Sequence, residues 1–228
     1  MESDGTGISS VRGRKRAADA VETLRACGVV PVIRTSTSEL ARTAVDWLSE
    51  AGMQTFEITL TTPGATSLIA DLALSGAGQL IGAGTVTSEA LARDAIASGA
   101  YYIVSPWVVP EVGRLCREHD VACLMGAMTP TEVAAACDAG ADVVKIFPAS
   151  SVGPAHMKAL GSVFPNTLMM PTGGIDASNI GSWVQAGAMC VGAGGKLVDE
   201  ALLKAGDKKA VIAVAQQLME AFQEARRL

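Results

Sequence analysis

The chain repeats one pattern eight times: a short run of β-branched and other apolar residues followed by a longer amphipathic stretch. Strands are expected at residues 29–33, 55–60, 80–82, 101–104, 122–124, 142–146, 167–170 and 189–191. This alternation is typical of β–α units, in which a helix joins each strand to the next parallel strand. Eight consecutive units predict an α/β fold whose strands close into a (β/α)8 TIM barrel.

The stretches between these strands carry the signals that begin and end helices. The spacing from Ser36 to Glu39 fits a capping box, and so does Thr129 with Glu132. One helix is expected to begin near Ser36, a short one at Pro154, and others at residues 15–26, 64–74, 88–97, 110–118, 130–139, 177–186 and 198–227. The helix at residues 15–26 precedes the first strand and is additional to the eight units.

A doubly wound parallel sheet is the competing fold for such an alternation. That fold would usually carry a G-x-G-x-x-G turn after its first strand, and no such turn follows residue 33. A chain of 228 residues, 49% of them hydrophobic, has the length and the apolar content for one barrel. We therefore assign residues 15–228 to a single barrel domain with an extra N-terminal helix, and residues 1–14 to a disordered tail.

Composition excludes several classes of partner. The formal net charge is −5, and only nine residues (3 Trp, 2 Tyr and 4 Phe) are aromatic, which argues against nucleic acid as a partner. No apolar run reaches the roughly 18 residues of a membrane span. The polar N-terminal segment also lacks the apolar centre of a secretory signal. A cytoplasmic protein that binds neither nucleic acid nor membrane is expected.

The cysteines and histidines predict neither a metal centre nor a cofactor. The five cysteines form no C-x-x-C pair, and His119 and His156 lie far apart in no metal-binding spacing. Cysteines in such apolar surroundings are typical of small core residues in a reducing compartment. A catalytic metal held by histidine is therefore not expected.

Polar residues and glycines cluster where the expected strands end. In TIM barrels the chemistry lies at the C-terminal ends of the strands, so these residues should converge on one rim. They include Arg34, Thr61, Thr85, Pro106, Thr172, Gly173, Gly174, Gly194 and Gly195. The paired glycines after the seventh and eighth strands suit a phosphate or other small anion held by backbone N–H groups, although glycine also serves in turns alone.

Lys145 is the least expected residue on this rim. Of the seven lysines, it alone lies inside an apolar strand, while the other six fall in expected helices or loops. A buried ammonium is costly, so burial favours the neutral amine, which is the form that attacks a carbonyl to give an imine. Lys145 is therefore a candidate Schiff-base nucleophile. The alternative is a structural ion pair with a nearby carboxylate.

Glu57 is a second charged residue inside an apolar strand. A carboxylate beside Lys145 across the barrel could move protons during a reaction, which makes Glu57 a candidate general acid and base. It could also serve only to neutralise the lysine, and the two roles are compatible.

Six motifs, in order and about one per strand, resemble those of the 2-keto-3-deoxy-6-phosphogluconate (KDPG) and 4-hydroxy-2-oxoglutarate (KHG) aldolases. They are Glu57–Leu60, Gly82–Val86, Val104–Pro106, Met128–Glu132, Lys145–Ala149 and Pro171–Gly174. The resemblance spans about residues 20–200. It implies a metal-independent class I aldolase of carbohydrate metabolism, a homotrimer of (β/α)8 barrels, with pyruvate as the nucleophilic partner.

The same resemblance implies a role for each candidate residue. Lys145 would form the iminium with the C2 ketone of the substrate, and Glu57 would act as general acid and base through a water molecule. The residues carried over to the substrate are Thr85, Pro106 and Phe147 at the pyruvate end, Thr172 at its carboxylate, and Gly173, Gly174, Gly194 and Gly195 at the phosphate.

The chain departs from its relatives near the substrate. Many relatives carry Arg at the position of Thr61, and others place an Arg at the end of the first strand, where this chain has Arg34. We therefore hypothesise that Arg34 supplies the cation for the substrate carboxylate. Gly195 replaces a usual Ser ahead of Lys196, and Trp107 stands where relatives are often smaller. These changes bear on the aldehyde half of the substrate more than on the imine chemistry.

The leading prediction is reversible cleavage of KDPG to pyruvate and D-glyceraldehyde 3-phosphate. One alternative keeps Lys145 and changes the aldehyde: the galactonate epimer, KHG, or an unphosphorylated substrate. Another is a sugar-phosphate isomerase or epimerase barrel, which would not require a lysine in the sixth strand. A ligand-binding barrel without activity is the third. Trapping of pyruvate on Lys145 separates most of these.

Overall fold

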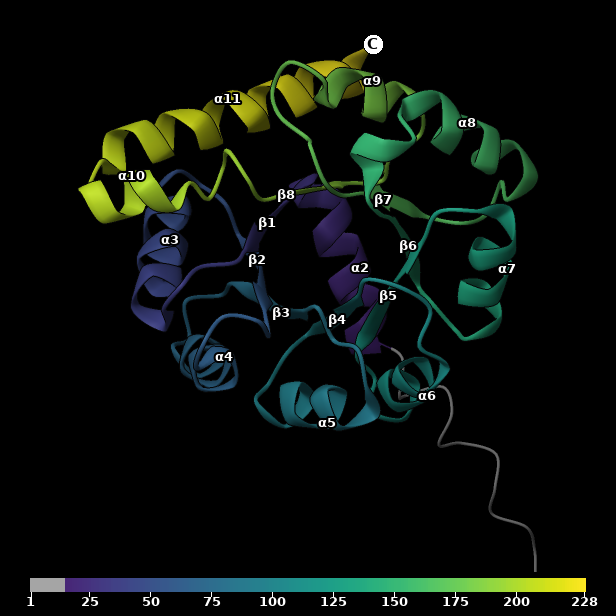
Figure 1. Cartoon of the computed structure of the whole chain (residues 1–228), viewed down its shortest axis with the longest axis horizontal. Coiled ribbons are helices and arrows are strands. Elements are labelled where there is room, and N and C mark those ends of the chain that lie inside the picture. The colour runs from purple at the N-terminus through teal and green to yellow at the C-terminus, as the bar shows by residue number, and fades with distance from the viewer. Residues whose placement is uncertain (1–14) are drawn as a thin grey trace, which may run out of the picture.

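The computed structural model describes residues 15–228, and the tail predicted at residues 1–14 lies outside the described residues. Eight parallel strands follow one another around a ring in the order β7-β6-β5-β4-β3-β2-β1-β8 (Figure 1). They are β1 (Val29–Ile33), β2 (Thr55–Thr59), β3 (Leu80–Gly84), β4 (Tyr102–Ser105), β5 (Ala122–Ala127), β6 (Val143–Ile146), β7 (Met169–Pro171) and β8 (Val191–Ala193).

The ring closes between β7 and β8. The N–H of Met189 donates to the carbonyl of Met169 at 3.0 Å, and Thr172 pairs with Gly192 in a parallel bridge. Closure removes the exposed edges that an open sheet would present. The predicted (β/α)8 barrel is confirmed.

Helices surround the ring of strands, as Figure 1 shows. They are α2 (Lys15–Cys27), α3 (Ser38–Glu50), α4 (Ala65–Leu74), α5 (Glu89–Ala97), α6 (Pro110–Glu118), α7 (Pro130–Asp138), α8 (Pro154–Val163), α9 (Ile180–Gln185), α10 (Glu200–Ala205) and α11 (Lys208–Arg227), with a 3-10 turn η1 (Ala149–Ser151). The prediction of one long final helix is wrong, because Gly206 ends α10 with a φ of 72°. Asp207 then caps α11.

Side-chain caps fix where two of these helices begin. Thr129 and Glu132 form the predicted capping box at the start of α7. The other predicted box is wrong: α3 is capped by Thr37, whose Oγ1 accepts from the N–H of Leu40 at 3.3 Å. Ser36 lies one residue too early for this role and makes a different contact, described below.

The interior of the barrel and helix α2 form one apolar core, separate from the core between the strands and the outer helices. Leu24 of α2 packs in one cluster with Leu80, Tyr102 and Val143, which are the first residues of β3, β4 and β6. The carboxylate of Asp120 caps the helix by accepting from the N–H groups of residues 16 and 17 at 3.0 and 3.2 Å. Helix α2 therefore closes the N-terminal end of the barrel and leaves the opposite rim to the polar residues.

Two glycines of β3 leave room inside the barrel for larger side chains. A Cβ on Gly82 would lie 2.2 Å from the ring of Tyr102, and one on Gly84 would lie 2.1 Å from Oε1 of Glu57. Both distances are far shorter than a carbon atom tolerates, because interiors are packed as densely as organic crystals. Glycine is thus required at these positions because Glu57 of β2 and Tyr102 of β4 occupy the space that a side chain on β3 would need.

We expect Gly82→Ala to destabilise the fold by roughly 1–3 kcal/mol, the usual cost of overpacking a buried site. Gly161→Ala is the matched control, because Gly161 lies in α8 and a Cβ there would meet nothing within 4 Å. Alanine is favoured over glycine within helices by roughly 0.5–1 kcal/mol, so the control should be neutral or slightly stabilising. The midpoints of urea unfolding measure both. Equal stability of Gly82→Ala and the parent would contradict the packing described.

Candidate active site

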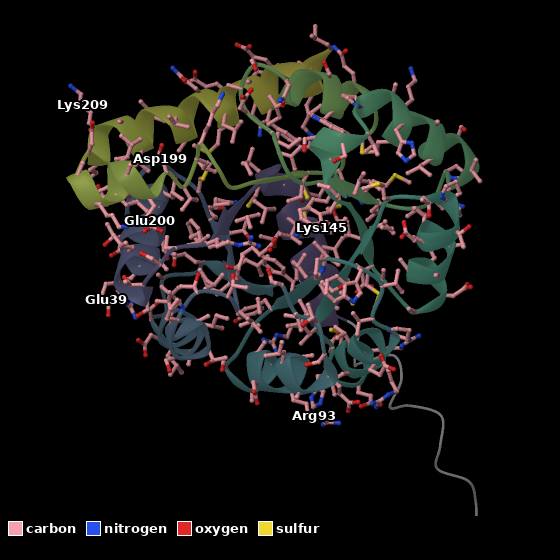
Figure 2. The ribbon with its side chains drawn as sticks, in the orientation of Figure 1. Glu39, Arg93, Lys145, Asp199, Glu200 and Lys209 are labelled. Atoms are coloured by element: carbon pink, nitrogen blue, oxygen red, sulfur yellow. The ribbon has the colours of Figure 1, made fainter. Side chains whose placement is uncertain are left out.

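The two charged residues predicted inside apolar strands meet within the barrel. Lys145 lies in β6 and Glu57 in β2, which are separated by three strands in either direction around the ring. Lys145 Nζ lies 3.7 Å from Glu57 Oε1, and the two side chains are only 7% and 1% exposed. Figure 2 shows Lys145 within the ring of strands, whereas Glu39, Arg93 and Lys209 lie at the periphery.

Strand alternation explains why Glu57 points inward. Its neighbours Phe56 and Ile58 belong to the outer core between the strands and the helices. Successive side chains of a strand face opposite sides, so Glu57 faces the interior. The same alternation in β6 sends Val144 and Ile146 outward and Lys145 inward.

Glu57 is not engaged in hydrogen bonds. Neither of its carboxylate oxygens has a hydrogen-bond partner among the described residues, and the 3.7 Å separation from Lys145 exceeds hydrogen-bond length. Buried polar groups are normally satisfied, and unsatisfied ones concentrate where a site must react or bind. The carboxylate therefore keeps its accepting capacity for a proton beside the amine.

The surroundings of Lys145 are close and partly aromatic. Its Nζ lies 5.1 Å from the centre of the Phe147 ring, within the range of a cation–π contact. Gly126 stands opposite Lys145 in the register of β5 and β6. A Cβ on Gly126 would lie 2.1 Å from the carbonyl oxygen of Pro106, so this glycine lets the Pro106 backbone approach β5. Phe147 therefore follows β6 beside the amine, and Pro106 follows β4 with its backbone against β5, the strand next to Lys145.

Arg34 and Thr85 are joined on the rim. Arg34 Nη2 donates to Thr85 Oγ1 at 3.3 Å, although the two residues are far apart in the sequence. Thr85 has a φ of 60°, a left-handed conformation that is uncommon for a β-branched residue and that concentrates at functional sites. Thr61, by contrast, lies with its Oγ1 3.0 Å from Thr59 Oγ1. The Arg34 guanidinium therefore lies on the rim beside the end of β3, having come from the end of β1.

A cavity of about 550 Å³ opens over this rim. Seven residues predicted to bind substrate line it, namely Arg34, Phe147, Thr172, Gly173, Gly174, Gly194 and Gly195. Thr61, Thr85 and Pro106 do not line this hollow, and Thr85 reaches it only through Arg34. The sequence therefore predicted most of the residues that line this cavity, and these residues follow four different strands.

Thr172 is the most deeply buried polar residue in the wall of the cavity. It is 5% exposed, and its Oγ1 has no hydrogen-bond partner among the described residues. A Cβ on Gly192 would lie 2.3 Å from that Oγ1, so glycine in β8 makes room for the hydroxyl. A hydroxyl without a partner is able to donate to an acceptor on a ligand, such as a carboxylate oxygen.

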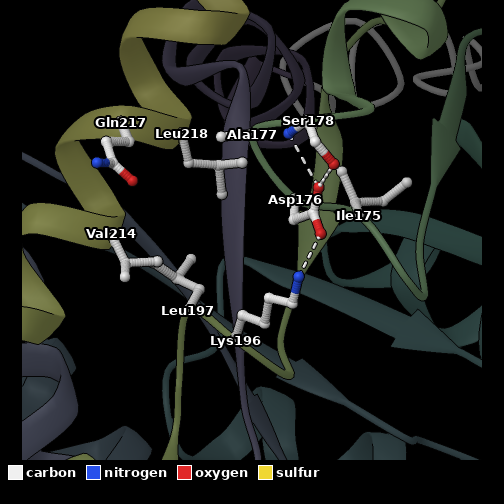
Figure 3. Close-up of a pocket in the computed structure, with 9 residues that line it drawn as sticks. All are labelled: Ile175, Asp176, Ala177, Ser178, Lys196, Leu197, Val214, Gln217 and Leu218. Atoms are coloured by element: carbon white, nitrogen blue, oxygen red, sulfur yellow. Dashed lines mark hydrogen bonds and ion pairs between the residues drawn. The ribbon is translucent and has the colours of Figure 1, made fainter.

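One residue of the cavity wall, Asp176, escaped the sequence prediction of the site, and its partner Lys196 was named there only as the neighbour of Gly195. Lys196 Nζ lies 2.8 Å from Asp176 Oδ2 (Figure 3). Both residues line the cavity. Hydrogen bonds from Lys196, and then from Ser178, lower the pKa of Asp176 to about 2. The carboxylate is therefore ionised at neutral pH. The only sequence signal of Asp176 was its place two residues after Gly174, in the loop between β7 and α9.

Glu200, at the start of α10, was also missed. Its carboxylate accepts from the N–H of Ser36 at 2.9 Å and from Ser36 Oγ at 2.6 Å. Hydrogen bonds from Lys204 and from Ser36 lower the pKa of Glu200 to about 2. This contact ties the loop that follows Arg34 to α10 of the eighth β–α unit.

The described part of the chain contains no group of three or more His, Cys, Asp and Glu side chains arranged to hold a metal ion. Within residues 15–228, no helix is both long and apolar enough to cross a membrane.

Comparison with known proteins decides the family. The model of the KDPG and KHG aldolase family matches residues 20–214. The chain belongs to the KDPG and KHG aldolase family. The family expected from the six sequence motifs is thus confirmed.

Individual aldolases of this family match nearly the whole chain. The 2-dehydro-3-deoxy-phosphogluconate aldolase of Treponema pallidum is 34% identical over 87% of this chain and 95% of its own length. The 2-dehydro-3-deoxy-6-phosphogalactonate aldolase of Escherichia coli is 34% identical over 86% and 95%. A crystal structure of KDPG aldolase from Legionella pneumophila, with pyruvate captured as a covalent carbinolamine, superimposes with a TM-score of 0.79 at 27% identity, over 87% of this chain and 97% of the other.

The buried pair can be tested without substrate. Lys145→Met leaves the Glu57 carboxylate buried without a counter-charge, which should destabilise the fold by roughly 3–5 kcal/mol. The double variant Lys145→Met with Glu57→Gln removes both charges and should recover most of that loss. Urea unfolding of the parent, the single variant and the double variant gives the comparison. A single variant as stable as the parent would show that the two charges do not depend on each other.

Proposed function

We propose that the protein is a class I aldolase that reversibly cleaves KDPG to pyruvate and D-glyceraldehyde 3-phosphate. The observation that carries the proposal is the buried amine of Lys145, 3.7 Å from a carboxylate that accepts no hydrogen bond from the described residues. A structural ion pair would gain from direct hydrogen bonds, since burial of charge is otherwise costly. Family membership supplies the reaction type that this geometry supports.

The first step uses Lys145 as a nucleophile. Its neutral amine adds to the C2 carbonyl of the substrate, and loss of water from the adduct leaves a protonated imine. The imine is a stronger electron sink than the ketone it replaces. Phe147 lies beside the amine, Pro106 is proposed to contact the pyruvate end, and Thr172 is proposed to donate its otherwise unpaired hydroxyl to the carboxylate.

The second step uses Glu57 as a base, acting through a water molecule. The C4 hydroxyl gives up its proton, the C3–C4 bond breaks, and its electron pair forms the enamine of pyruvate while the aldehyde leaves. Glu57 then acts as an acid and returns a proton to C3. Water hydrolyses the resulting imine, which releases pyruvate and restores Lys145.

The aldehyde end lies over the glycine pairs of β7 and β8. Backbone N–H groups of Gly173, Gly174, Gly194 and Gly195 are proposed to hold the phosphate, as glycine-rich strand ends do in other TIM barrels. We also propose that the reaction needs no metal, since the iminium polarises the bond that breaks, and that the protein acts as a homotrimer, as the family resemblance implies.

A second candidate keeps the lysine and changes the aldehyde. The relative from Escherichia coli is named for the galactonate epimer, and KHG or an unphosphorylated substrate would use the same imine. The specific observation is Gly195, where a Cβ would meet nothing within 4 Å. The wall of the cavity is therefore open where a larger side chain would contact the aldehyde half.

The imine predicts a covalent trap. Incubation with pyruvate and borohydride should add the mass of reduced pyruvate to a peptide that contains Lys145, and to no other lysine. Lys145→Met with Glu57→Gln should give no adduct, whereas Lys158→Met, on the outer helix α8, should label like the parent. Absence of any adduct on folded protein would refute the class I mechanism. If the adduct forms, a panel of aldehydes with pyruvate defines the specificity.

Arg34 is expected to recognise the pyruvate carboxylate. Arg34→Ala should raise the KM for pyruvate in the condensation direction about tenfold or more, the usual effect of removing a charge-assisted hydrogen bond. Arg42→Ala is the matched control, because Arg42 pairs with Asp71 at 2.6 Å outside the mouth of the barrel. Steady-state kinetics at varied pyruvate measure both. An unchanged KM in Arg34→Ala would remove Arg34 from the substrate site.

A further inference from the structure

The ion pair between Lys196 and Asp176 stands between two hollows. Both residues, with Ile175, line the cavity over the barrel mouth and also a smaller pocket of about 230 Å³ beneath α11. Figure 3 shows Lys196, in the loop after β8, extending toward Asp176. The pair therefore forms part of the wall where the aldehyde end of a substrate would lie.

The two partners are held very differently. Asp176 Oδ1 also accepts from the N–H and the hydroxyl of Ser178, and its side chain is 24% exposed. Lys196 is 79% exposed and makes its one described polar contact with Asp176. Exposed ion pairs of this kind contribute roughly 0–1 kcal/mol, so the ammonium exchanges partners at little cost. Asp176 is the fixed partner and Lys196 the movable one.

Lys196 is also the available cation at this end of the cavity. The charged residues in the described lining are Arg34, Asp176 and Lys196, and Arg34 is bonded to Thr85 at the pyruvate end. Next to Lys196, Gly195 has no side chain, and the space that a Cβ would enter is open. The ammonium thus has both the freedom and the room to turn toward a ligand held over the glycine pairs.

We propose that Lys196 and Asp176 set selectivity for the aldehyde partner, because Lys196 leaves Asp176 to bind the terminal phosphate of the substrate while Asp176 competes for the same ammonium. A phosphate dianion attracts the ammonium more strongly than a single carboxylate does. An aldehyde without phosphate has nothing to displace Asp176. This inference rests on the proposed aldolase function and adds to it the group that distinguishes phosphorylated from unphosphorylated aldehydes.

The test is the selectivity ratio, defined as kcat/KM for glyceraldehyde 3-phosphate divided by kcat/KM for glyceraldehyde, each with pyruvate. Lys196→Met should lower the ratio roughly tenfold or more, through a higher KM for the phosphorylated aldehyde. Asp176→Asn keeps the oxygen that accepts from Ser178 and removes the competing charge, so it should raise the ratio severalfold. Opposite shifts in the two variants are the signature of competition for one ammonium.

Lys208→Met is the matched control, because Lys208 Nζ pairs with Glu50 at 2.6 Å between α11 and α3, away from both hollows. It should leave the ratio unchanged. If Lys196→Met and Asp176→Asn lower only the urea midpoint, with an unchanged ratio, the ion pair is structural and the inference fails. Borohydride trapping of pyruvate on Lys145, in the parent and in the same variants, separates the two hypotheses. If the parent forms no adduct, the aldolase function is refuted. If the parent and the variants form the adduct but the ratio is unchanged, only the role of Lys196 is refuted.

Discussion

A lysine and a carboxylate that share the dry interior of the barrel constrain the rest of the structure. Removing each charge from water costs several kcal/mol, and attraction between the two offsets that cost only at short range. Strands β2 and β6 must therefore keep the alternation that turns Glu57 and Lys145 inward to within 3.7 Å. A slip of one residue in either strand would move a charge into the apolar layer beneath the outer helices.

The two ends of the barrel differ because of this pair. Helix α2 seals the N-terminal end with apolar side chains, and the buried Tyr102 hydroxyl there is satisfied by Thr55 Oγ1 at 3.1 Å. Burial raises the pKa of Tyr102 well above its ordinary value, so this hydroxyl stays neutral. Because α2 closes this end, the rim at the opposite end is left for the polar residues and the cavity that they line.

Side-chain contacts join the loops around the mouth of the barrel. Arg34 joins Thr85, Ser36 joins Glu200, and Lys196 joins Asp176. Each contact links residues of different β–α units, so the rim is fixed by ties across the barrel mouth rather than by the strands alone. The deep pair supports the proposed imine chemistry, and the Lys196–Asp176 contact is where we propose that the aldehyde partner is selected.

The sequence by itself determined the eight strands and the singular status of Lys145 and Glu57, because periodicity reports which face of a segment is buried and a charge on that face stands out. It also placed the glycine pairs at the ends of the seventh and eighth strands, because each pair closely follows an apolar run. The break of the last helix at Gly206 was missed, since the flanking residues favour helix on both sides. The contact of Lys196 with Asp176 was invisible too. Lys196 and Asp176 lie in loops, where the sequence has no periodicity to report burial. Their contact depends on long-range packing, because only closure of the barrel brings the end of β7 beside the end of β8.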